Sequence, residues 1–295
     1  MYVTNHPLLH LHRVPVVLLM TLALTLSCSK PTPKPTGPAA DYEAAKDMFK
    51  RFRIDRALEY TYGLANASPA TKYTERARVL RAVILVGQLK SSAEAMEAYT
   101  KGAEQTKNAH FKAEYARLRH DNMQDGMRAG LGLAETTHQL LSGGTISKEL
   151  TLEASYPTTE GPIEVREFER IREGGWVEPD QQDAAALDSL RKGIDDALAD
   201  AVTGDRSKAR NALASGSTEI SGLDFALFLG KGLADGAVLF DRKHGRDGQR
   251  LKTVCSEADE AMKAAAALLK ANPDKDKEKQ LKKLQDQIKA TLKNV

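Results

Sequence analysis

The histidines and cysteines of the chain do not form a recognisable catalytic or metal-binding pattern. The histidines that follow the apolar N-terminal stretch are His110, His120, His138 and His244, without an HExxH pair, and no Cys-x-x-Cys spacing for zinc occurs. The chain also lacks a GxSxG nucleophile motif and a phosphate-binding P-loop. From the sequence we therefore assign no catalytic residue, no metal ligand and no cofactor.

Carboxylates are concentrated between residues 160 and 178. They are Glu160, Glu164, Glu167, Glu169, Glu173 and Glu178. Because several arginines lie among them, the sequence favours an exposed, charge-compensated surface over carboxylates tuned for acid/base catalysis. Trp176, the single tryptophan of the chain, lies in the same stretch. It either packs this segment onto neighbouring helices, which we favour, or contacts a ligand.

Glycines recur at helical spacing in both halves of the chain, as Gly126 with Gly130 and Gly232 with Gly236. Glycine costs a helix about 1 kcal/mol relative to alanine, so the recurrence indicates close approach of neighbouring helices. Residues 223–240 are the most apolar segment after the N-terminal stretch, although charged residues lie within it. Because charges are unfavourable in lipid, we expect a core helix that lines a cavity.

The N-terminal apolar stretch, residues 14–26, is shorter than the about 20 residues that a membrane-spanning helix needs. It is typical of a signal peptide. The sequence Leu24-Thr25-Leu26-Ser27-Cys28 resembles the lipobox of bacterial lipoproteins. The resemblance implies that residues 1–27 are a cleaved leader and that Cys28 carries the lipid. The alternative is an ordinary secretory signal in which Cys28 has no role.

Residues 28–40 contain the Pro-rich run KPTPKPTGPAA, which predicts an extended tether of about 3 Å per residue. Residue Ser29 follows Cys28, and the absence of an Asp there favours the outer membrane. We expect a membrane-anchored protein that faces the periplasm. If Cys28 carries the lipid, Cys255 has no other cysteine in the chain with which to form a disulfide. We interpret Cys255 as a small buried hydrophobic residue.

Composition favours an all-α fold. Aromatic residues make up 5% of the chain and alanine is abundant, which suits close-packed helices better than a sheet sandwich. The formal net charge of +3 is nearly balanced, so we expect no nucleic-acid partner.

Residues 41–142 are expected to form an N-terminal bundle of helical pairs. Residues 41–66 predict two helices broken near Ile54. This pair resembles a tetratricopeptide repeat at four positions, which are Ala45, Ala57, Leu64 and Pro69. Two further pairs are expected, 74–90 with 92–106 and 109–123 with 125–141. The resemblance implies a helical-hairpin repeat array.

An irregular central arm is expected at residues 143–180, where glycines and prolines interrupt the helical pattern. Residues 181–295 are expected to form a C-terminal helical bundle. Its last segment, residues 275–292, places Leu281, Leu284, Ile288 and Leu292 on one stripe opposite lysines, which predicts a terminal capping helix. The alternative is a basic amphipathic helix that lies on a membrane surface.

These features favour a protein-interaction scaffold of the bacterial envelope, which binds another envelope protein or a peptide segment. If the first helical pair packs as the repeat resemblance implies, Tyr42, Lys46, Phe49 and Lys50 form a basic and aromatic groove for that partner. A second reading is a solute-binding accessory lipoprotein, because the layout resembles the T-components of tripartite periplasmic transporters. A third is an envelope hydrolase whose site is covered by the central arm.

Overall fold

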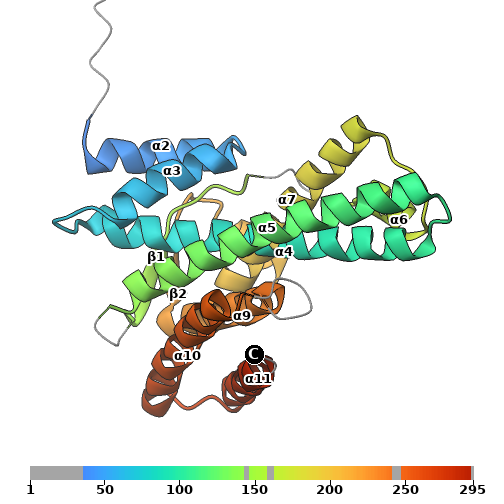
Figure 1. Cartoon of the computed structure of the whole chain (residues 1–295). Coiled ribbons are helices and arrows are strands. Elements are labelled where there is room, and N and C mark those ends of the chain that lie inside the picture. The colour runs from blue at the N-terminus through green and yellow to red at the C-terminus, as the bar shows by residue number, and fades with distance from the viewer. Residues whose placement is uncertain (1–35, 143–145, 158–162, 241–246, 294–295) are drawn as a thin grey trace, which may run out of the picture. The chain divides into compact units, whose positions relative to one another are not determined.

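The computed structural model describes residues 36–142, 146–157, 163–240 and 247–293. From Gly37 onward these residues belong to one compact unit (Figure 1). They are mostly helical, with a single small sheet, so the predicted all-α class is confirmed. The expected signal peptide at 1–27 and the lipid-bearing Cys28 lie outside the described residues.

The first two helices, α2 (Pro38–Lys50) and α3 (Ile54–Ala65), form the expected helical pair. Helix α2 begins inside the stretch expected to be a tether. Proline is favoured in the first turn of a helix because its missing N–H has no partner there in any case. The break between the two helices contains Phe52 in a left-handed conformation, with φ of 56°.

The next two elements, α4 (Lys72–Gln105) and α5 (Ala109–Leu140), are each one long helix. The expected pairs 74–90/92–106 and 109–123/125–141 are therefore wrong, and the described residues do not confirm the helical-hairpin repeat array. Neither expected break contains the proline or glycine that would end a helix. Helix α4 begins with a capping box at Thr71, and Asn108 caps α5. Figure 1 shows the two long helices running alongside each other, where they pack together.

The central segment contains β1 (Glu149–Leu152) and the short helix α6 (Arg166–Arg172). Strand β1 pairs antiparallel with β2 (Thr218–Ser221), with Leu150 opposite Ile220. Both of these side chains are buried. The described parts of the expected irregular arm are therefore attached to the rest of the fold, β1 through its pairing with β2 and α6 through packing against α4 and the helix that comes next in the chain.

The C-terminal part begins with α7 (Pro179–Val202) and α8 (Arg206–Ala212). Helix α9 (Gly222–Ala237) follows β2 and continues into a 3-10 turn, η1 (Val238–Phe240). The last helices are α10 (Gly248–Ala271) and α11 (Lys275–Leu292). Helix α11 buries Leu281, Leu284 and Ile288 of the predicted stripe, whereas Leu292 in its last turn is exposed.

One hydrophobic core is shared by the two bundles that the sequence suggested. Helix α4 packs against α5, α7 and α9, and α10 packs against both α5 and α9. Helix α9 is buried along almost its whole length, as expected for residues 223–240. Among the helices of the described ranges, none has both the length and the apolarity needed to cross a bilayer.

Candidate functional site

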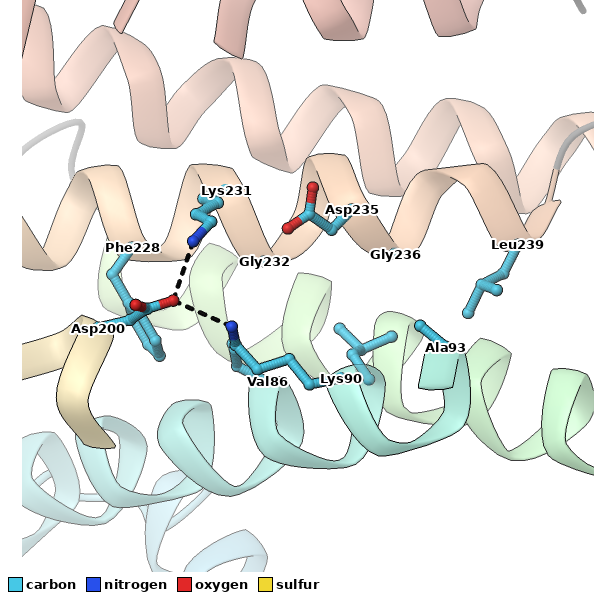
Figure 2. Close-up of a pocket in the computed structure, with 11 residues that line it drawn as sticks. Val86, Lys90, Ala93, Asp200, Phe228, Lys231, Gly232, Asp235, Gly236 and Leu239 are labelled. Carbon is cyan, nitrogen blue, oxygen red and sulfur yellow. Dashed lines mark hydrogen bonds and ion pairs between the residues drawn. The ribbon is translucent and has the colours of Figure 1, made fainter. Parts of the chain in front are cut away.

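A cavity of about 250 Å³ lies between α4, α9 and the C-terminal end of α7 (Figure 2). We call it the α4–α9 cavity. Its walls are mainly apolar but include four charged residues. It is lined by Val86, Leu89, Lys90, Ala93, Asp200, Phe228, Lys231, Gly232, Asp235, Gly236 and Leu239.

Two glycines of α9 hold one wall of this cavity close to α4. A Cβ atom added at Gly232 would lie 2.7 Å from Cγ2 of Val86, which is closer than carbon atoms normally approach. A Cβ atom at Gly236 would lie 3.2 Å from Cδ2 of Leu89. The predicted role of these glycines in close helix packing is therefore confirmed, and the helix that carries them lines a cavity as expected.

Three charged side chains from three helices meet at the edge of the cavity. Asp200 of α7 forms ion pairs with Lys90 of α4, at 3.0 Å, and with Lys231 of α9, at 2.9 Å. Figure 2 shows both lysines directed toward this carboxylate. Burial opposes ionisation of Asp200, but the hydrogen bonds and charges of the two lysines outweigh it and lower the pKa of Asp200. The carboxylate is therefore ionised at neutral pH and links the three helices.

The cavity is small and mainly apolar. Its volume is below the 300–1,000 Å³ typical of small-molecule sites, but it can hold one large apolar side chain or a small ligand. No serine, cysteine or histidine is among its lining residues. Asp235 at the rim accepts a hydrogen bond from Gln287 of α11, at 3.2 Å.

The prediction of a partner-binding groove on α2 is wrong. Tyr42 and Phe49 are fully buried, because the helix turns this face toward the rest of the fold rather than toward solvent. Lys46 pairs with Glu43 and with Glu153, at 2.8 and 3.2 Å. Lys50 remains exposed. Regular spacing identified residues of one helical face but not which neighbour that face meets.

Trp176 packs the central segment onto α5, as the favoured reading predicts. Its ring stacks on Phe111, with centroids 4.6 Å apart, and lies 6.0 Å from the ring of Tyr115. Its Nε1 donates a hydrogen bond to Glu178, at 3.2 Å. The side chain is half-buried, and it is not among the residues that line the α4–α9 cavity.

Two of the carboxylates of residues 164–178, Glu164 and Glu169, form ion pairs with arginines. Arg172 pairs with Glu169 and with Glu97 of α4, each at 2.6 Å, and Arg166 pairs with Glu164. Within the described ranges, histidine, cysteine and acidic residues form no group able to hold a metal ion. The expectations for Glu160 and His244 lie outside the described residues.

Cys255 is buried in the core, as the sequence suggested. Burial raises the pKa of its thiol to about 11, because the thiolate is poorly solvated there.

Sequence reasoning missed Lys90 and Asp200 as members of the cavity. Lys231 and Asp235 could have been recognised from the sequence, since they are charged residues within the most apolar segment. No sequence pattern identifies Asp200, because its ion pairs join helices that are distant in sequence. Comparisons with protein-family models, curated proteins and solved structures find no significant match to this chain.

Proposed function

We propose that this chain is a lipid-anchored, periplasm-facing scaffold that binds another envelope protein through the α4–α9 cavity. The observation that carries the proposal is the cavity itself. Its volume of about 250 Å³ suits one large apolar side chain, and apolar anchors that fill such pockets supply much of the affinity of protein interfaces.

The charged groups at the edge of the cavity define the partner further. Lys90, Lys231, Asp200 and Asp235 place both signs of charge around an apolar floor. An anchor side chain flanked by polar or charged residues can form further polar contacts with this edge, whereas a wholly apolar acyl chain can form none.

The location rests on the sequence. The lipobox-like Leu24 to Cys28 and the Pro-rich run after it support attachment to a membrane, with the helical unit held in the periplasm. A partner would then belong to the same envelope compartment. The outer membrane is favoured because residue 29 is not Asp.

A second candidate function is solute binding as an accessory lipoprotein of a periplasmic transport system. One observation favours it: the glycine-containing helix α9 lines an apolar cavity. In this case the cavity holds a small molecule rather than a side chain of a partner.

Site-specific photo-crosslinking separates the two functions. Ala93 is exposed and lines the cavity, so a photoreactive residue placed there in the full, membrane-anchored chain should yield a cross-linked protein. The matched control is Ala184, an exposed alanine of α7 that does not line the cavity. The same products at both positions, or none at Ala93, would contradict the scaffold.

Filling the cavity provides the second arm of the experiment. Ala93→Trp should abolish co-purification of the cross-linked protein, and Ala184→Trp should preserve it. If native mass spectrometry instead finds a small molecule on the unmodified chain that Ala93→Trp excludes, solute binding replaces the scaffold.

A further inference from the structure

A second hollow, of about 470 Å³, lies among α3, α4, α5 and α7. It differs from the α4–α9 cavity in having polar and apolar groups mixed along its walls. It is lined by Asp55, Leu58, Arg81, Leu85, Gln88, Ser91, Ser92, Asn122, Asp125, Arg128, Ala129, Gly132, Ala186 and Leu190. We call it the Arg81 hollow.

Arg81 of α4 is the most buried charged group of this hollow, with 9% of its surface exposed. Its Nε donates to Oγ1 of Thr136, at 3.2 Å, and its Nη1 donates to the carbonyl oxygen of Leu58, at 3.3 Å. The guanidinium also lies over the ring of Tyr62, with Cζ 4.9 Å from the ring centroid. These three contacts fix its orientation.

None of these contacts neutralises the charge of Arg81. Among the described residues, no carboxylate lies within ion-pair distance of its guanidinium, and Nη2 has no hydrogen-bond partner. This nitrogen is 3.6 Å from the position that a Cβ of Gly132 would occupy, and Gly132 lines the hollow. Nη2 is therefore directed toward the hollow.

An ion that is buried without an ion-pair partner is unfavourable. Burial lowers the pKa of Arg81 and outweighs the nearby charge of Glu135, which raises it, but an arginine keeps its proton at neutral pH. The second arginine of the hollow, Arg128, already pairs with Asp125, at 2.8 Å. Of the two arginines of this hollow, Arg81 is therefore the one that forms no ion pair with a carboxylate.

We propose that the Arg81 hollow binds a small organic carboxylate. The carboxylate oxygens accept hydrogen bonds from the guanidinium at Nη2, and the carbon chain contacts Leu58, Leu85 and Leu190. Gln88 and Asn122 provide neutral hydrogen-bonding groups for polar substituents on that chain.

The charge of the walls favours a carboxylate over a phosphate. Arg81 is the arginine of the hollow that forms no ion pair, and one carboxylate can pair with it. A phosphate dianion would bring a second negative charge into a hollow that already contains Asp55 and Asp125.

Isothermal titration calorimetry on the full chain tests the proposal with hexanoate as the probe. Hexanol and inorganic phosphate serve as comparison probes. We expect hexanoate to bind at least tenfold more tightly than either, because only hexanoate combines one negative charge with an apolar chain. Equal binding of hexanol or tighter binding of phosphate would overturn the assignment, as would no binding of hexanoate.

Variants then assign the binding to this hollow. Ala186→Trp fills the hollow from an exposed position without removing a hydrogen bond of Arg81, and should weaken hexanoate binding at least tenfold. Ala184→Trp, on the same helix outside the hollow, should leave it unchanged. Arg81→Met should also weaken it tenfold or more. If Arg81→Met does not fold, Ala186→Trp decides alone, and unchanged binding in that variant would overturn the proposal.

Discussion

Gly232 of α9 and Val86 of α4 approach so closely that a single added methyl group does not fit between them. The added carbon would lie 2.7 Å from Cγ2 of Val86 and 3.1 Å from Cδ2 of Leu133. All three residues are buried, and packed side chains would have to shift to admit the added carbon. This contact sets the distance between the helices that bound the α4–α9 cavity.

Gly232→Ala should therefore destabilise the protein. Alanine favours a helix by about 1 kcal/mol over glycine, but overpacking a core costs about 1–3 kcal/mol. We expect a net fall in the free energy of unfolding, measured by urea denaturation. The control is Gly63→Ala in α3, where an added Cβ meets nothing within 4 Å. That variant should be more stable than the parent by up to about 1 kcal/mol, and a stabilised Gly232→Ala would show that the helices separate easily.

Asp200→Asn should lower the free energy of unfolding by about 1 kcal/mol at pH 7, because Lys90 and Lys231 lose their shared counter-ion. The pKa of Asp200 is lowered in the folded state, so its contribution is complete above the unfolded pKa of about 3.9 and is lost as pH falls through the folded pKa. The difference between the parent and Asp200→Asn should therefore shrink in acid. Urea midpoints measured across that range check this, and a constant difference would contradict it.

Glu153 links two helices through one carboxylate, and its removal should be costly. It pairs with Lys46 of α2 and with Arg76 of α4, and 15% of its side chain is exposed. Glu153→Gln leaves both cations without their shared partner, so we expect a loss of about 1–3 kcal/mol in unfolding free energy. Glu43→Gln is the matched control, because exposed Glu43 pairs with the same lysine at 2.8 Å. It should change stability by less than about 0.5 kcal/mol.

The thiol of Cys255 should be unreactive in the folded protein at pH 8. Its side chain is 1% exposed and burial raises its pKa to about 11, so it provides little accessible thiolate. A thiol-reactive dye should distinguish the parent from Cys255→Ala in urea but not in buffer. Rapid labelling of Cys255 in buffer would indicate frequent local opening of α10.

The sequence predicted those elements whose patterns are local. The break near Ile54, the buried segment at 223–240 and the apolar stripe of α11 all follow from spacing along a single helix. The close helix approach at Gly232 followed from the cost of glycine in a helix.

The incorrect predictions concern relationships between elements. Residues 79–86 of α4 are buried on nearly every side, so apolar periodicity could not distinguish one long helix from two short ones. The aromatic face of α2 meets the core because of its neighbours, which spacing does not identify. The pairing of Lys90 with Asp200 joins residues far apart in the chain, and only tertiary packing brings them together.

The ladder between β1 and β2 also has a consequence for how the chain folds. Helices α4 and α5 are consecutive and pack on each other, so they require closure of only a short loop. Pairing Leu152 with Thr218 instead closes a loop that contains α6, α7 and α8. Closing a long loop has a larger entropic cost, and such contacts slow folding. We expect the long helical pair to acquire protection from hydrogen exchange early in refolding and the ladder to acquire it last.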